Sequence, residues 1–311
     1  MIINRDEKKY FKINASKYDK TKNFFVYRPS SINNPKNNSV IFVKSKFLDR
    51  VTDILFLKEC IVFLPFDFNV PKELGENNLV IKCEKPNIEF CRFFKENNIA
   101  NLPVNDTFIE KNGSFISDRA KIGKDVTIFP GVLIGSDVTI GDNVYIGSGT
   151  KIVGEVYIGN NVTIRENTTI GADGLTTDRD TDGSALTMPQ FGYILIENNV
   201  MIGANVVIAR GAIDATIIRK GAKIDNCVFI SHNVEIGKDT FIVGETILFG
   251  SSSTGERCII SGNTTIANNV HIGSDSILGS GAVATKTIPG NSVAIGCPAK
   301  VIREKRPGEE V

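Results

Sequence analysis

A six-residue period of branched aliphatic side chains constrains this sequence more than any other feature. Isoleucine occupies every sixth position from 116 to 170, then 196, 202 and 208, then every sixth position from 218 to 242. The spacing continues to position 278, mainly with isoleucine and leucine. An α-helix repeats every 3.6 residues and a strand every two, so neither produces this period. A short strand followed by a turn does, because each step returns the next branched side chain to one interior. We therefore predict a β-solenoid.

The residues between the isoleucines suit tight corners around an apolar column. Glycine often follows isoleucine, as in "IGSDVTIGDNVYIG", and asparagine or aspartate stands two or three places later. Glycine and asparagine tolerate the positive φ that a corner every six residues requires. Each fully buried isoleucine contributes about 1.5–3 kcal/mol of transfer free energy.

The composition narrows the class of protein. The chain has 311 residues, a formal net charge of +1 and six cysteines. This charge balance disfavours a dedicated nucleic-acid-binding protein. The cysteines form no C-x-x-C pair, so we expect reduced, mostly buried thiols. The N-terminus lacks the apolar stretch of a signal peptide, and no apolar run approaches the roughly 18 residues that span a bilayer. We therefore expect a cytoplasmic protein without a membrane span.

The period and its corner residues resemble the hexapeptide-repeat family, whose members fold as left-handed parallel β-helices with three hexapeptides per coil. The hand is implied by the resemblance alone, because the general preference for right-handed crossovers predicts the opposite. We therefore expect a mainly β protein. It would contain a small N-terminal α/β domain at 1–113, a left-handed parallel β-helix at 114–288 and a short C-terminal helical tail at 289–311.

Two interruptions of the period must leave the column as loops. The first, residues 171–193, is rich in Gly, Asp, Thr and Ser and has no apolar period. Loops this long inside compact domains are usually functional or disordered. We predict a substrate-contacting lid, with "MPQFG" as its closing anchor. The second is a four-residue bulge in "RGAIDAT", where Ile208 and Ile218 stand ten positions apart.

His232 is one of two histidines, and Gly250 stands eighteen residues later. That separation places Gly250 on the same face of the adjacent coil, about 4.8 Å away. An imidazole removes a proton from an attacking amine or hydroxyl, and an exposed glycine N–H stabilises a tetrahedral oxyanion. Together they suit direct acyl transfer from a thioester. The alternative is a surface histidine without a role.

Residues 188–244, with "RGA", "KIDN" and "ISHNVEIG", resemble the lipid A pathway N-acyltransferases. Those enzymes transfer a hydroxyacyl chain from acyl carrier protein to the amine of a UDP-linked glucosamine. The resemblance implies that His232 is the general base and that the Gly250 amide binds the oxyanion. We also expect Asn233 to contact substrate. Asp214 or Asp225 would orient the imidazole, and we favour Asp214; both are otherwise ordinary loop carboxylates.

Two departures from that branch point to coenzyme A as the acyl donor. The second histidine of its "I-A-G-H" stretch is replaced by Asn269, which we expect on the nucleotide-sugar side, with His271 exposed nearby. Residues 284–306, "ATKTIPGNSVAIGCPAKVIREKR", resemble the ending of CoA-dependent acetyltransferases. That likeness implies a closing helix and makes Lys300 and Arg303 candidates for the CoA 3′-phosphate. A solvated helical cap is the alternative.

Residues 1–113 lack the six-residue period and have the strand and helix patterns of a small α/β domain. They resemble the N-terminal nucleotide-binding domain of the same N-acyltransferases. In that family an "F-L-x-N-P-K-Y" element holds the uracil, and "FVKSKF" is its nearest counterpart here. Phe42 and Phe47 are therefore candidates for stacking on a pyrimidine, with burial in the core as the alternative.

We expect a homotrimeric N-acyltransferase that moves an acyl group from acyl-CoA to the amine of a UDP- or dTDP-linked amino sugar. Family resemblance places its site between subunits. One alternative is a lipid A-type N-acyltransferase that uses acyl carrier protein, and another is O-acylation, because one base serves either nucleophile. A γ-class carbonic anhydrase needs three histidines around zinc and the chain has two, so we expect no metal. A non-catalytic β-helical scaffold is the last alternative.

Overall fold

The computed structural model describes residues 8–99, 106–306 and 308–309. Contacts between residues divide the chain into two compact units. The first comprises Met1–Leu102 with Leu175–Phe191, and the second comprises Pro103–Gly174 with Gly192–Val311. The sequence predicts boundaries after residues 113 and 288. In the structure, Leu175–Phe191, which we call the insertion, also belongs to the N-terminal unit.

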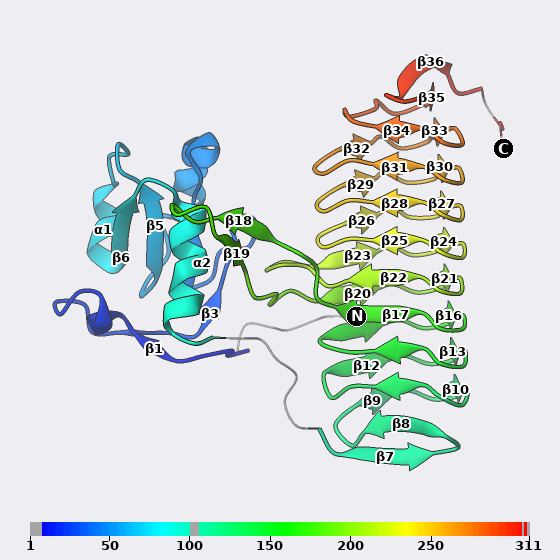
Figure 1. Cartoon of the computed structure of the whole chain (residues 1–311), viewed down its shortest axis with the longest axis horizontal. Helices are drawn as coiled ribbons and strands as arrows, with labels where there is room; N and C mark the ends of the chain where they lie inside the picture. The colour runs from blue at the N-terminus through cyan, green and yellow to red at the C-terminus, as the bar shows by residue number, and fades with distance from the viewer. Residues whose placement is uncertain (1–7, 100–105, 307, 310–311) are drawn as a thin grey trace. The chain divides into compact units, whose positions relative to one another are not determined.

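The second unit is a solenoid of short strands in three sheets, stacked coil upon coil (Figure 1). The first sheet contains β8 (Ser114–Ser117), β11 (Leu133–Ile134), β14 (Lys151–Ile152), β17 (Thr169–Ala172), β22 (Val207–Ala209), β25 (Phe229–Ile230), β28 (Ile247–Leu248), β31 (Thr265–Ile266) and β34 (Val283–Ala284), with β7 (Phe108–Lys111) antiparallel at its edge. The second contains β9 (Lys121–Ile122), β12 (Val138–Ile140), β15 (Val156–Ile158), β20 (Ile194–Ile196), β23 (Thr216–Ile218), β26 (Glu235–Ile236), β29 (Ser253–Thr254) and β32 (His271–Ile272). The third contains β10 (Thr127–Ile128), β13 (Tyr145–Ile146), β16 (Thr163–Ile164), β21 (Met201–Ile202), β24 (Lys223–Ile224), β27 (Phe241–Ile242), β30 (Ile259–Ile260), β33 (Ile277–Leu278), β35 (Ser292–Ile295) and β36 (Lys300–Glu304).

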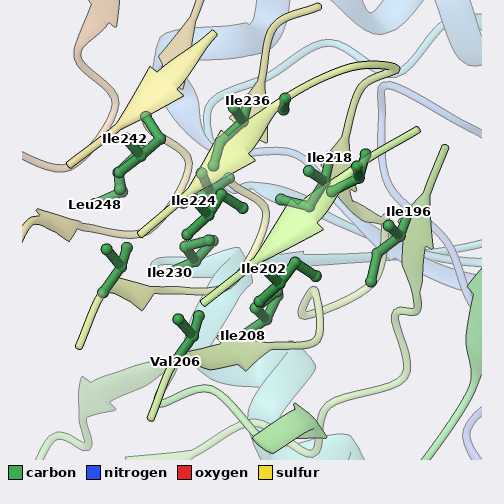
Figure 2. Close-up of a cluster of buried hydrophobic side chains, with 14 of the residues drawn as sticks. Ile196, Ile202, Val206, Ile208, Ile218, Ile224, Ile230, Ile236, Ile242 and Leu248 are labelled. Atoms are coloured by element: carbon green, nitrogen blue, oxygen red, sulfur yellow. The ribbon is translucent and has the colours of Figure 1, made fainter. Parts of the chain in front are cut away.

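The period of six in the sequence is the register of these sheets. Equivalent isoleucines pair from coil to coil, as Ile134 does with Ile152. The pairing continues across the insertion, where Ile158 pairs with Ile196. All four side chains are 0% exposed, and Figure 2 shows the column that such residues form. The predicted β-solenoid is confirmed.

The corners use asparagine and glycine for different physical reasons. The third residue after an inward isoleucine adopts the left-handed conformation, as in Asn143 (φ 56°) and Asn161 (φ 57°). The glycine directly after an inward isoleucine generally does not, and Gly171 (φ 95°), which follows Ile170, is an exception. At Gly147 a Cβ atom would lie 2.8 Å from the backbone nitrogen of Glu166 in the next coil. This glycine therefore permits close approach of adjacent coils, a requirement that the sequence analysis had assigned to positive φ.

The predicted C-terminal helical tail is wrong. Residues 300–304 form β36, which pairs antiparallel with β35. The last parallel strand of a solenoid leaves a row of backbone N–H and C=O groups without partners. An extended tail satisfies those groups, and a helix would leave them exposed.

The N-terminal unit contains a four-stranded parallel sheet in the order β3-β4-β5-β6, against which α2 packs. Its elements are β1 (Ile13–Asn14), η1 (Ala15–Lys17), β2 (Phe25–Val26), β3 (Arg28–Pro29), β4 (Ser39–Phe42), η2 (Ser45–Ile54), β5 (Ile61–Pro65), α1 (Lys72–Asn77), β6 (Leu79–Cys83), α2 (Pro86–Glu96), and the hairpin β18 (Thr177–Arg179) and β19 (Ala185–Thr187) of the insertion. Of the helices described, none has the length and apolar character needed to cross a membrane.

Candidate active site

His232 follows β25 at the corner between the first and second sheets, and its half-buried ring packs against two glycines. A Cβ atom at Gly250 would lie 2.6 Å from the ring Nε2. A Cβ atom at Gly174 would lie 2.8 Å from the His232 Cβ. Both distances are shorter than real carbon contacts allow. Any other residue at either position would therefore displace the histidine or its neighbour.

Asn233 sets the orientation and tautomer of the imidazole. Its Oδ1 lies 3.1 Å from the His232 Nδ1 and accepts the backbone N–H of Ala212 at 3.0 Å. Because this oxygen is an acceptor, the hydrogen-bond network assigns the ring proton to Nδ1. The lone pair is then on Nε2, beside Gly250. The Asn233 backbone N–H donates to Thr216 Oγ1 at 2.9 Å, which holds the corner in place.

The backbone N–H of Gly250, a buried residue beside the His232 ring, lacks an internal acceptor among the described residues. In the part of the chain that the structure describes, it donates no hydrogen bond. At several other corners a side chain of the next coil caps the equivalent amide. Asp142 donates to Asn160 Oδ1 at 2.9 Å, and Ala204 donates to Asn226 Oδ1 at 2.7 Å. An uncapped N–H beside a basic ring nitrogen is the arrangement that a developing oxyanion needs.

The two candidate aspartates occupy different places. Asp214 lies in the bulge, where its carbonyl oxygen is 1.9 Å from the position of a Cβ at Gly211. Asp225 lies at the corner between the third and first sheets, and its Oδ2 accepts the Gly244 N–H at 3.2 Å. The group in contact with Nδ1 is the amide oxygen of Asn233. An orienting role for Asp214 stays a prediction. The sequence analysis assigns no orienting role to Asn233, which follows His232 directly in "SHN".

Asn269 lies on the same corner, one coil beyond Gly250, and its N–H donates to the Gly250 carbonyl at 3.2 Å. Its side chain is exposed, so it is accessible to a ligand. His271 lies on β32 of the second sheet, where its Nδ1 is 2.9 Å from Ser253 Oγ. The two histidines therefore belong to different surroundings.

The proposed nucleotide-binding rings differ in environment. Phe42 ends β4 and packs against Phe90 of α2, with ring centroids 4.7 Å apart. Phe47 is 37% exposed, and the Lys46 ammonium lies 4.7 Å from its ring centroid. Phe47 therefore has exposed ring surface, whereas Phe42 contributes to the packing of α2.

Of the two tail cations proposed to bind CoA, Arg303 has a carboxylate partner within the protein. Arg303 donates to Glu309 at 2.9 Å, and hydrogen bonds from this guanidinium lower the pKa of Glu309 to about 2. Lys300 is exposed on β36. Lys300 is thus the freer of the two cations proposed for the CoA phosphate. Across residues 8–99, 106–306 and 308–309, no group of three or more His, Cys, Asp or Glu side chains is placed to hold a metal ion.

Comparisons with known proteins agree with this architecture. The family model described as bacterial transferase hexapeptide (six repeats) matches residues 119–154 and 140–172, and hexapeptide repeat of succinyl-transferase matches 193–232. A solved UDP-N-acetylglucosamine acyltransferase from Bacteroides fragilis has a TM-score of 0.57 at 26% identity, covering 63% of this chain and 74% of its own. Its counterpart from Campylobacter jejuni has a TM-score of 0.53 at 21% identity, covering 62% and 74%. The expected left-handed parallel β-helix is confirmed.

Curated UDP-3-O-acylglucosamine N-acyltransferases are similar in sequence. One from Francisella tularensis subsp. holarctica is 52% identical over 79 residues, which are 25% of this chain and 23% of the relative. Another, from Bordetella pertussis, is 37% identical over 128 residues, or 40% and 35%. The chain therefore spans less than half the length of these relatives. The resemblance to the N-acyltransferases is confirmed over those stretches.

Proposed function

We propose that this chain, whose solenoid carries the hexapeptide repeat of bacterial transferases, is an acyltransferase acting on a nucleotide-linked amino sugar. The similarity to UDP-3-O-acylglucosamine N-acyltransferases and the fold shared with a UDP-N-acetylglucosamine acyltransferase support this class of substrate. The observation that carries the proposal is the pairing of His232 Nε2 with the Gly250 corner, whose N–H has no partner among the described residues.

The proposed reaction is a direct attack of the sugar amine on the thioester carbonyl. His232 Nε2 takes a proton from the amine as the C–N bond forms. The Gly250 N–H stabilises the negative charge on the carbonyl oxygen of the tetrahedral intermediate. The C–S bond then breaks, and the imidazolium returns its proton to the leaving thiolate. In the neutral imidazole, the Asn233 oxygen accepts from the Nδ1–H and so leaves the lone pair on Nε2.

The acyl donor that we propose is acyl-CoA, with Lys300 near the CoA phosphates and Arg303 as a second candidate. Transfer from acyl carrier protein, in a reaction of the UDP-3-O-acylglucosamine N-acyltransferase type, is the second candidate function. It is favoured by the 52% identity to such a relative. The tail forms a strand where the resemblance to CoA-dependent acetyltransferases implies a helix, which removes one argument for acyl-CoA as the donor.

For the acceptor, we propose a UDP- or dTDP-linked amino sugar, with Asn269 as a group of the solenoid that contacts it. Phe42 and Phe47 stay candidates for stacking on a pyrimidine. Asp214, in the bulge beside the His232 corner, is proposed to support the orientation of the imidazole. O-acylation remains the alternative if the acceptor carries a hydroxyl at the reacting position.

Exchange of the catalytic base tests the mechanism. The variant His232→Asn should lower kcat by a factor on the order of 10²–10⁴, because an amide does not accept the amine proton. The matched variant His271→Asn, at the other histidine, should keep the wild-type kcat. Turnover measured by mass spectrometry with a panel of UDP- and dTDP-amino sugars would settle the comparison. Equal turnover in the His232→Asn variant and the wild type contradicts the proposal.

A donor exchange distinguishes the two candidate functions. The same acceptor is offered with short-chain acyl-CoA and, separately, with hydroxyacyl carrier protein. Activity with acyl-CoA alone supports the first proposal, and activity with the carrier protein alone supports the second. In the first case Lys300→Ala should raise the KM for acyl-CoA, while Lys305→Ala serves as the control for a tail lysine.

A further inference from the structure

Arg210 follows β22 at the corner between the first and second sheets, one coil before His232. Ile208 of β22 pairs with Ile230 of β25, and Arg210 and His232 each stand two positions later. Arg210 is only 8% exposed, and a buried charge is costly unless opposite charge and hydrogen bonds compensate it. Asp173 supplies such a group, because Arg210 Nε donates to its Oδ1 at 2.6 Å and Nη2 contacts the same oxygen.

The same arginine also holds the chain beside Asp173 through its backbone. The Arg210 N–H donates to the carbonyl of Ala172 at 3.0 Å. Just before Ala172, β17 shifts its register with β22. Gly171 stands at the shift, with a φ of 95°, and a Cβ atom there would lie 1.7 Å from the Val153 carbonyl oxygen. The segment is therefore fixed by a backbone and a side-chain contact to Arg210, directly after a bend that requires glycine.

Gly174, the next residue, lies against the His232 side chain. A Cβ atom at Gly174 would lie 2.8 Å from the His232 Cβ and 3.2 Å from its Cδ2. At the other end of the ring, Cε1 and Nε2 would each lie 2.6 Å from a Cβ atom at Gly250. Asn233 contacts Nδ1. Of these three neighbours of the imidazole, Gly174 is the one joined covalently to the aspartate that Arg210 binds.

We propose that Arg210 is a positioning residue, whose bond to Asp173 holds Gly174 against the His232 imidazole. All four residues belong to the second unit. Arginine suits this task because its planar guanidinium offers donors in a fixed fork, whereas lysine offers a point charge on a flexible stem. Small misplacements of a catalytic group are costly in rate. The expected effect on kcat rests on the proposed function, whereas the effect on the ring requires no activity.

Imidazole NMR of protein labelled with ¹³C at histidine Cε1 tests this role, because the chain has only two histidines. In Asp173→Asn and in Arg210→Lys, the His232 signal should shift and the His271 signal should stay in place. The Asp173 side chain is 55% exposed, so its exchange for an amide should leave the fold intact.

The matched controls are Asp275→Asn and Arg257→Lys. They weaken another arginine–aspartate pair of the solenoid, whose Nε–Oδ1 and Nη2–Oδ2 distances are both 2.8 Å, and they should leave the His232 signal in place. Gly174→Ala crowds the ring directly and gives the signal of a displaced imidazole. Gly135→Ala gives that of an undisturbed one, because a Cβ there has its nearest neighbours at 3.6 Å.

Steady-state kinetics separate positioning from direct binding of the anionic substrate by the arginine charge. In Asp173→Asn and Arg210→Lys, kcat should fall by about 2- to 30-fold while the KM for the UDP- or dTDP-amino sugar stays unchanged. The double variant should lose no more than the more damaging single variant, because both break the same bond.

An unchanged His232 signal in folded Asp173→Asn and Arg210→Lys proteins overturns the inference, as does a raised KM with kcat unchanged. A shifted signal together with wild-type kcat supports the positioning of the ring by Arg210. That outcome would contradict the proposed catalytic role of His232 instead.

Discussion

The two histidines differ in the groups around their rings. His271 lies on a strand and contacts a serine hydroxyl. His232 lies at a corner where an asparagine oxygen contacts one nitrogen and the absence of a side chain at Gly250 lets the ring pack against the backbone. A general base needs a defined tautomer. Of the two histidines, His232 is the one whose ring contacts a side-chain amide oxygen.

A methyl group at Gly250 should test the space beside Nε2. In Gly250→Ala the new carbon would lie 2.6 Å from Nε2, so the ring must move. A displacement on the order of 1 Å costs about 10²-fold in rate, and we expect a loss of that size in kcat. Gly135→Ala, where a methyl group fits, is the control in the same steady-state assay. Equal kcat values in both variants would contradict the geometry of the site.

At the scale of the element, each short strand owes its stability to the column that it shares with adjacent coils. Ile202 is 0% exposed, whereas Ile122 in the first complete coil is 38% exposed. We expect Ile202→Ala to lower the free energy of unfolding by about 2–5 kcal/mol, because it creates a cavity. Ile122→Ala should cost about 1 kcal/mol or less. Chemical denaturation of both variants measures the difference, and equal losses would argue against a continuous core.

The terminal strand β36 should depend on pH through one carboxylate. The pKa of Glu309 falls from 4.5 to about 2 because Arg303 donates hydrogen bonds to it. Because the folded state lowers this pKa, the contribution to stability is complete above about pH 4.5. It is lost as the pH falls toward 2.

Hydrogen exchange of the β36 amides measures this dependence. Glu309→Gln should exchange faster than wild type at pH 6, and the difference should narrow as the pH approaches 2. Glu304→Gln, which removes a carboxylate of the same segment, is the matched control. A difference between Glu309→Gln and wild type that is independent of pH would show that the ion pair does not hold the tail.

At the scale of the whole molecule, we predict a homotrimer. Exposed apolar side chains stand close to the proposed site in sequence, with Phe229 at 39% and Phe249 at 40% exposed. A second copy would bury such surface, and the resemblance to the hexapeptide family implies three. Light scattering should give about three times the chain mass of 33.9 kDa. A monomer mass at assay concentration would contradict both the trimer and a site shared between subunits.

The solenoid, its register and the neighbourhood of His232 and Gly250 follow from the sequence. An inward residue at every sixth position predicts a column of isoleucines. The resemblance to the hexapeptide-repeat family implies three hexapeptides per coil, and this coil length fixes which residues are neighbours. Even the pairing of Ile158 with Ile196 obeys this rule, because the insertion leaves the column without changing its order.

Other features depend on contacts between residues far apart in the chain, which no local pattern encodes. The insertion is bound by Arg92, 88 positions before Asp180. The tail forms a strand because the last coil offers an unpaired edge. The choice of Asn233 over an aspartate as the partner of Nδ1 depends on the folded bulge, whose Ala212 N–H fixes the amide oxygen. The sequence by itself thus determined the repeating coils, because their period is local. The tertiary structure decided which residues the insertion, the bulge and the tail contact, because those partners are far away in the chain.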